Sequence, residues 1–115
     1  VTFGKPIASR QAIKFKLADM EIRLQTARAQ LFYNAQLIDK GIYDGMLGSV
    51  TKTCVSEMVF DVANQALQIF GGYGYSREYP VEKLLRDARI FSLFEGTNEI
   101  QRMIIGGTLV PKKRN

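Results

Sequence analysis

A single acidic side chain, Glu95, stands where it could do chemistry, within the segment FSLFEGTNEIQRMII at residues 91–105. It follows Phe94, precedes Gly96 and lies between two apolar stretches. A carboxylate in apolar surroundings can act as a general base, because little water competes for its charge. Ser92 and Glu95 also have the spacing of a helix capping box. From the residues alone the capping role is favoured, although a glycine in the first turn of a helix weakens it.

A second candidate site is the glycine-rich segment GGYGY at residues 71–75. It does not fit a dinucleotide-binding fingerprint, because Arg77 takes the place of the third glycine and the segment follows a predicted helix instead of a strand. Two interpretations stay open. The glycines could let backbone amides meet a pyrophosphate, with Gln68 as an added donor. They could also simply end the preceding helix, which the pattern alone favours.

The composition excludes several kinds of site. The chain of 115 residues has no histidine and one cysteine, so it holds no His-based triad, no His-ligated zinc and no internal disulfide, and we expect no metal. No apolar run reaches the length of a membrane span and no signal peptide is visible. We therefore expect a bacterial cytoplasmic or mitochondrial matrix protein that is not secreted. The basic tail PKKRN at 111–115 lacks interleaved aromatics, which favours a solvated tail over nucleic-acid binding.

Helices must position these residues. Apolar side chains recur every three or four positions over residues 13–42, which predicts a first helix over 8–40. Further helices are predicted over 47–70, over 81–91 after Pro80, and from 95–98 to 105, where Gly106 and Gly107 end the chain's last helix. Two apolar stripes on the second helix predict burial on two sides, with another subunit as one candidate partner. The predicted fold is all-α, an antiparallel up-and-down four-helix bundle.

Two separated blocks resemble a known family. QIFGGYGYSREYPVEKLLRDARIFSLFEGTNEIQRMII is similar to the C-terminal signature of the flavin-dependent acyl-CoA dehydrogenases, and TFGKPIASRQAIKFKLADM resembles the start of the same domain. The resemblance implies that residues 1–115 are a single C-terminal helical domain, without the family's N-terminal helical and middle β-domains. It also implies an acyl-CoA substrate, FAD as cofactor, a homotetramer built as a dimer of dimers, and electron-transfer flavoprotein as electron acceptor.

The resemblance assigns roles to individual residues. Glu95 matches the catalytic base, which removes the α-proton of an acyl-CoA thioester while a β-hydride passes to FAD, giving a trans-2-enoyl-CoA. Phe94 replaces the more usual tyrosine beside the substrate, and Gly96 leaves room for the thioester. Phe3 would touch the FAD of a neighbouring subunit. The full set of implied FAD contacts is Phe3, Arg10, Gln11, Gln68, Ile69, Phe70, Gly71, Gly72, Thr97, Asn98 and Glu99.

Other functions stay open on the sequence. The chain could be a non-catalytic oligomerisation module of the same fold, although a scaffold has no need of the Glu95 segment. An acyl-CoA oxidase would share the base and differ in how oxygen reaches the flavin. The sequence does not define the acyl chain length. Because the chain supplies one wall of the implied FAD site, we expect it to bind FAD weakly or not at all when isolated, and still to self-associate.

Overall fold

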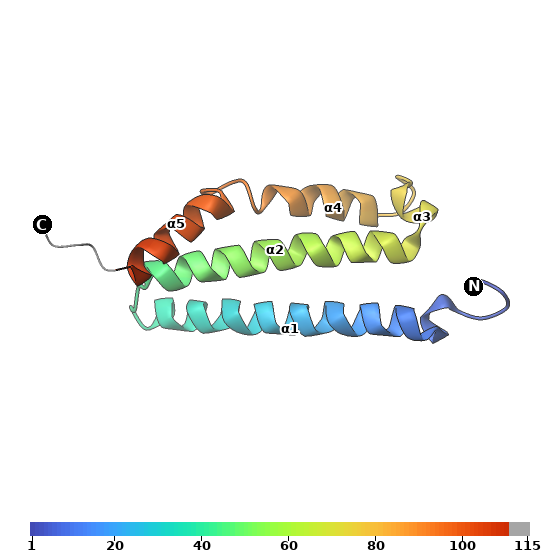
Figure 1. The fold of residues 1–115 in the computed structure, drawn as a ribbon, viewed down its shortest axis with the longest axis horizontal. Helices are drawn as coiled ribbons and strands as arrows, with labels where there is room; N and C mark the ends of the chain where they lie inside the picture. Colours follow the sequence, from blue (N-terminus) through green and yellow to red (C-terminus); the bar gives the residue numbers. More distant parts are fainter. Residues whose placement is uncertain (111–115) are drawn as a thin grey trace, which may run out of the picture.

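The computed structural model describes residues 1–110, so the basic tail lies outside the described part (Figure 1). Helices joined by short loops make up this part, and no strand occurs within it. In chain order the elements are η1 (Ile7–Ser9), α1 (Gln11–Asp39), α2 (Gly45–Phe70), α3 (Gly72–Tyr75), α4 (Val81–Ile90) and α5 (Asn98–Leu109). The fold is elongated, 69 × 28 × 23 Å.

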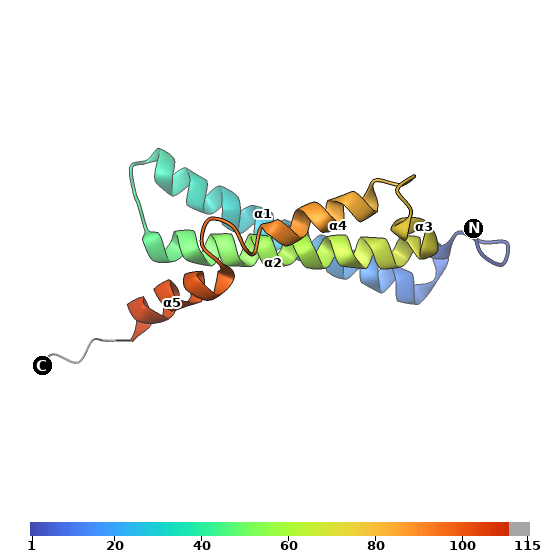
Figure 2. The same ribbon diagram turned by 90° about the horizontal axis from the view of Figure 1, so that it is seen from above.

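Helix α2 is the common partner of the other helices. It packs antiparallel to α1 on one side, while α4 and α5 follow one another along its other side (Figures 1 and 2). Within residues 1–110, α1 contacts neither α4 nor α5. The predicted all-α, up-and-down fold is confirmed. Helix α2 has partners on two sides within the chain, as predicted, and its contact with another subunit stays a prediction.

Local interactions set where the helices begin. Arg10 is extended (φ −80°, ψ 134°) and separates η1 from α1, so the first long helix begins at Gln11. The Asp44 carboxylate accepts the backbone N–H of Leu47 at 3.0 Å, which starts α2 at Gly45, two residues earlier than predicted. A side-chain cap of this kind satisfies a backbone donor that the first helical turn leaves free.

The predicted end of α5 was wrong. The helix runs through Gly106 and Gly107 to Leu109, and the N–H of Val110 still donates to the Gly106 carbonyl at 3.0 Å. A glycine in a helix costs about 1 kcal/mol relative to alanine, which weakens a helix without forcing it to end. Helix α5 packs against α2 as a whole, but a Cβ added at Gly106 or Gly107 would meet no atom within 4 Å, so the helix continues here through its own backbone hydrogen bonds.

Little of the apolar surface is buried inside this chain. Among residues 1–110 the fully buried apolar side chains are Ala27, Val81 and Ala88, all of them small or medium in size. On α1, by contrast, Phe15 and Phe32 are each 60% exposed. Large exposed apolar side chains in such numbers are typical of a surface that another protein part covers. No helix in the described part is both long and apolar enough to cross a membrane.

Candidate active site

Glu95 lies in the loop that joins α4 to α5, in an unusual backbone conformation. Its φ is +54° and that of Gly96 is +82°, so both residues are left-handed. For a residue with a side chain this region costs about 1–2 kcal/mol, and it persists only where neighbours hold it. The loop is closed at its ends by Phe94 N–H donating to Ile90 O at 3.0 Å and by Asn98 N–H donating to Ser92 O at 3.1 Å.

The capping-box interpretation of Glu95 is wrong. The cap of α5 is Thr97, whose hydroxyl accepts the backbone N–H of Ile100, so Glu95 stands two residues before the cap. The Ser92 hydroxyl donates to the Arg89 carbonyl at 3.1 Å instead of capping α5. Glu95 is exposed, and within residues 1–110 its carboxylate makes no hydrogen bond or salt bridge. The side chain therefore serves no backbone group in this part of the molecule.

An apolar pocket of about 420 Å³ adjoins Glu95. Helices α1 and α2 and the loop after α4 all contribute to its lining, which consists of Leu31, Thr51, Lys52, Val55, Ser56, Val59, Phe91, Phe94 and Glu95. The rings of Phe91 and Phe94 pack edge to face, with their centres 5.4 Å apart. The arrangement places one ionisable acid among mostly apolar side chains, as a site for an apolar substrate with one reactive carbon would require.

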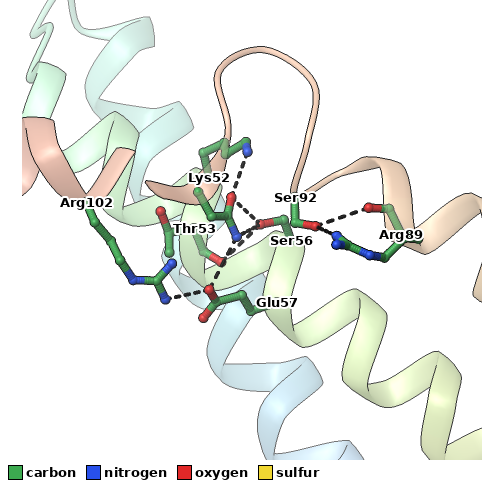
Figure 3. Close-up of polar contacts among 8 residues, drawn as sticks. Lys52, Thr53, Ser56, Glu57, Arg89, Ser92 and Arg102 are labelled. Carbon is green, nitrogen blue, oxygen red and sulfur yellow. Dashed lines mark hydrogen bonds and ion pairs between the residues drawn. The ribbon is translucent and has the colours of Figure 1, made fainter. Parts of the chain in front are cut away.

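A polar cluster beneath the loop joins α5 to α2 (Figure 3). Its centre is the Asn98 side chain, which is only 3% exposed. The Asn98 amide nitrogen donates to Ser56 Oγ at 3.0 Å and to Glu57 Oε1 at 3.3 Å, and its amide oxygen accepts from Lys52 Nζ at 2.7 Å. An ion pair between Arg102 and Glu57 extends the cluster. The Asn98 side chain thus points to α2, and its predicted contact with FAD stays a prediction.

Two side chains hold the loop from below, and sequence reasoning missed both. Lys52 Nζ donates to the Gly96 carbonyl oxygen at 2.9 Å. The buried Gln101 donates through Nε2 to the carbonyl oxygens of Glu95 at 3.1 Å and of Gly96 at 3.3 Å. One signal was present: Lys52 falls three residues before Val55, in line with an apolar stripe of α2, where a charged residue needs a polar partner.

The N-terminal residues implied in FAD binding form a turn of their own. Thr2 and Lys5 pair through two backbone hydrogen bonds, and Phe3 at the turn is left-handed (φ 53°) and exposed. The Arg10 guanidinium lies 5.6 Å from the centre of the Phe3 ring. Gln11 follows as the first residue of α1. An exposed aromatic ring and a neighbouring cation are groups that could meet a cofactor or another subunit.

The segment Gln68–Gly72 lies at the C-terminal end of α2. Gly71 ends this helix in a left-handed conformation (φ 62°), which confirms the helix-ending interpretation. A Cβ added at Gly71 or Gly72 would meet no atom within 4 Å, so the backbone here is open to approach. Gly74 differs, because a Cβ there would lie 2.8 Å from the carbonyl oxygen of Leu67. The helix-ending role therefore leaves the pyrophosphate interpretation open.

The implied FAD residues fall into two groups within this chain. Ile7 shares a pocket with Ile69 and Phe70, so the N-terminal segment and the end of α2 lie at one end of the molecule (Figure 1). Thr97, Asn98 and Glu99 lie elsewhere, since Asn98 contacts Ser56. Gln68 follows Ser56 by 12 residues, which is about 18 Å along a helix. The structure does not bring the two groups together.

Comparison with known proteins gives consistent matches. Residues 1–110 match the family described as acyl-CoA dehydrogenase, C-terminal domain. An acyl-CoA dehydrogenase of Bacillus subtilis is 48% identical over 96% of this chain and 29% of its own length. The caffeyl-CoA reductase-Etf complex subunit CarC of Acetobacterium woodii is 42% identical, again over 96% of this chain and 29% of the relative.

Solved structures agree with these matches. Butyryl-CoA dehydrogenase of Megasphaera elsdenii superimposes with a TM-score of 0.93 at 43% identity, over 96% of this chain and 29% of that one. A structure described as the FAD complex of PigA has a TM-score of 0.88 at 29% identity, over 95% of this chain and 28% of that one. The chain thus spans under a third of the length of its relatives. It belongs to the acyl-CoA dehydrogenase family and corresponds to that family's C-terminal domain.

Proposed function

We propose that the chain is the C-terminal, FAD-binding and oligomerisation domain of an acyl-CoA dehydrogenase, with Glu95 as its catalytic base. The observation that carries this proposal is the unpaired Glu95 carboxylate at an apolar pocket of about 420 Å³. An acyl group in this pocket would present its α-carbon to the only acid that lines it. A scaffold role explains neither the free carboxylate nor its left-handed backbone.

Different groups of this chain have different roles in removing the α-proton. An α-proton next to a thioester is weakly acidic, so the base must be held close and correctly oriented. The carboxylate is exposed in the described chain, and we propose that bound substrate and cofactor complete the apolar enclosure that Phe94 and the pocket lining begin. Within residues 1–110 the backbone N–H groups of Glu95 and Gly96 donate to no acceptor. We propose that they receive the thioester oxygen as charge develops on it.

FAD supplies the acceptor for the β-hydride when it is bound, and trans-2-enoyl-CoA is the product. The residues of this chain fit a cofactor at two places. Gly71 and Gly72 leave the backbone open for a pyrophosphate beside Gln68, with Phe3, Arg10 and Gln11 at the same end. Thr97–Glu99 lie about 18 Å away along α2. This separation supports a homotetramer in which each chain contacts two FAD molecules, and the FAD complex of PigA supports the choice of cofactor.

The electron acceptor of the reduced enzyme is a separate proposal. The relative named as a subunit of a caffeyl-CoA reductase-Etf complex supports electron-transfer flavoprotein as the acceptor. An oxidase would instead react with oxygen itself. Rapid reoxidation of the reduced flavin by dissolved oxygen, at a rate that matches turnover, would replace the dehydrogenase proposal with the oxidase.

The test uses the full-length parent protein, with wild type beside Glu95→Gln. Acyl-CoA thioesters of different chain length are added without oxygen, and the visible absorbance of the flavin is followed. We expect the wild type to bleach with at least one thioester, while Glu95→Gln retains its flavin and does not bleach. Glu21→Gln, an exposed acid on α1, is the matched control and should bleach like the wild type. Equal bleaching by Glu95→Gln would place the base elsewhere, and no bleaching by the wild type would favour the scaffold.

A further inference from the structure

We infer that Lys52 is a positioning residue for the catalytic base, holding the Glu95–Gly96 turn in its left-handed conformation through the Gly96 carbonyl. The inference rests on the proposed function for its catalytic meaning, although the contact itself does not. Lys52 belongs to α2, and the turn belongs to the loop before α5. One ammonium group therefore connects the central helix of the fold to the residue that follows the base.

The hydrogen bonds at Lys52 form a directed chain. Ser56 and Asn98 hold one another through Nδ2 and Oγ at 3.0 Å. The Asn98 amide oxygen accepts from Lys52 Nζ at 2.7 Å, and the same Nζ donates to the Gly96 oxygen at 2.9 Å. Because Asn98 and Ser56 are buried at 3% and 4% exposure, this part of the chain has little freedom to rearrange. The hydrogen bond to Asn98 thus orients the ammonium group towards the loop.

The Lys52 ammonium group donates to two uncharged oxygens, the Gly96 carbonyl and the Asn98 amide. Within residues 1–110 no carboxylate forms a salt bridge with it. The Gly96 carbonyl oxygen accepts two hydrogen bonds, one of them from Lys52. Hydrogen bonds from a charged donor are roughly twice as strong as neutral ones, so the one from Lys52 is the stronger. The other comes from Gln101 at 3.3 Å. Gly96 adopts a positive φ readily, whereas Glu95 does not, so these donors help to account for the left-handed conformation at Glu95.

The turn decides where the carboxylate of Glu95 lies. With φ at +54°, Glu95 directs its side chain differently from a residue in the ordinary helical region. If the Gly96 carbonyl loses its ammonium partner, only the Gln101 amide still holds the turn, so we expect the turn to shift and to displace the Glu95 carboxylate from the pocket. Misplacement of a catalytic group by about 1 Å can cost roughly 100-fold in rate. Lys52 also lines the pocket, but loss of its ammonium group should slow proton removal far more than it changes substrate binding.

The test compares Lys52→Met with wild type in the full-length parent protein, by crystal structure and by flavin reduction at saturating acyl-CoA. Methionine keeps the length and apolar stem of the side chain and removes the ammonium group. We expect Glu95 to leave its left-handed conformation, and the reduction rate to fall roughly 10- to 100-fold. The KM should change by less than about twofold, and the α-deuterium isotope effect should rise, since proton removal becomes slower.

The matched control is Lys16→Met. Lys16 also joins two helices, donating from α1 to the Gln65 side chain at 2.8 Å, but it contacts no part of the loop. It should leave the Glu95 conformation and the rate unchanged. A crystal structure of Lys52→Met with an unchanged Glu95–Gly96 turn would overturn the inference. A turn that shifts in Lys52→Met while wild type reduces its flavin with no thioester would overturn the proposed function and leave the role of Lys52 in holding the turn intact.

A second variant covers the case in which Lys52→Met does not fold. Gln101→Met removes the other donor to the Gly96 oxygen, so it should shift the same turn and slow flavin reduction in the same way. Lys52 and Gln101 both donate to the Gly96 oxygen, and Gln101 also donates to the Glu95 oxygen. Because both side chains hold the same turn, the effects of the two substitutions should not add in the double variant. Full additivity, with no shift of the turn in Gln101→Met, would show that the two side chains act independently and would count against the inference.

Discussion

The Lys52 ammonium nitrogen lies 2.9 Å from the carbonyl oxygen of Gly96, a residue 44 positions later in the chain. This contact joins the central helix α2 to the residue that follows Glu95. The loop before α5 is therefore shaped by a residue of α2 that lies 44 positions earlier in the chain, and not only by its own sequence. The predictions below test the parts of this arrangement and the surfaces around it.

Gly96→Ala should damage the site. Gly96 has a φ of +82°, and a Cβ there would lie 3.0 Å from Nε2 of Gln101. An alanine in a left-handed conformation costs about 1–2 kcal/mol, and its methyl group would push away a side chain that supports the loop. We expect a lower unfolding midpoint and slower flavin reduction in the full-length parent, measured by thermal unfolding and by stopped-flow absorbance.

Gly48→Ala is the control for that substitution. Gly48 lies within α2, and a Cβ there would meet no atom within 4 Å. Alanine is favoured over glycine in a helix by about 1 kcal/mol, so this variant should be as stable as wild type or slightly more so. If Gly96→Ala and Gly48→Ala behave alike, the left-handed turn is not required for the site.

Asn98→Ala should destabilise the contact between α5 and α2. The Asn98 side chain bonds to Lys52, Ser56 and Glu57, and its removal costs each partner one hydrogen bond while each keeps another. A net hydrogen bond contributes about 0.5–1.5 kcal/mol, and more where one partner is charged. We expect a loss of about 2 kcal/mol in the free energy of unfolding by urea. Asn64→Ala, at an exposed position on α2, should change the free energy of unfolding by less than about 0.5 kcal/mol. If Asn98→Ala and Asn64→Ala have equal effects, the polar cluster does not stabilise the contact between α5 and α2.

Ile22→Glu should weaken self-association of the chain. Ile22 is 63% exposed on the face of α1 that carries Phe15 and other apolar side chains without a partner in residues 1–110. A charge at a buried apolar contact is costly to desolvate, so association through this face should decline. Sedimentation at a series of concentrations measures the effect. Lys14→Gln makes the same change in net charge at an exposed polar position, and association should persist; a wild type that stays monomeric throughout would refute the prediction.

Glu99 gives a pH-dependent contribution to stability. Its pKa is lowered below 4.5 by a hydrogen bond from its own backbone N–H and by the Thr97 hydroxyl. Because the folded state holds the proton less tightly than the unfolded state, the stabilisation is present above pH 4.5 and is lost as pH falls through the lowered pKa.

Glu99→Gln should therefore have a lower free energy of unfolding than wild type at pH 7, and the two should become more alike in acid. Urea unfolding at pH 7 and pH 3 measures the difference in each condition. Thr97→Ser keeps a hydroxyl at the cap and should retain the pH dependence of wild type. A difference between Glu99→Gln and wild type that is the same at both pH values would show that ionisation of Glu99 is not its cause.

The helices could be predicted because their signals are local. Apolar spacing located α1, α2 and α4, and the two stripes of α2 correctly indicated burial on two sides. The end of α5 could not be predicted in this way. Two adjacent glycines are a strong local signal for a helix end, but their cost of about 1 kcal/mol each does not force one, and the backbone hydrogen bonds of α5 continue as far as Val110.

The site was predictable only in part. The resemblance assigned Glu95, whereas its local spacing from Ser92 favoured a cap that the structure contradicts. Spacing cannot reveal that Glu95 has a positive φ, because that conformation depends on donors from α2 and α5. Neither the resemblance nor the spacing assigned a role to Lys52 or Gln101. Their roles arise from contacts between segments distant in the sequence, which only the folded chain brings together.

Between Ser49 and Phe70 the helix α2 contains neither glycine nor proline, so it is a stiff rod with a contact at each end: the Glu95 loop near Lys52 and the open glycines after Gln68. In the homotetramer proposed above, such a rod would fix the distance between the two FAD sites that each chain contacts. Inserting one residue in its middle would turn one end by about 100° relative to the other, whereas seven residues would nearly restore the facing sides and lengthen the rod by about 10 Å. In that proposal the number of residues in α2 determines the distance and the relative orientation of the two sites.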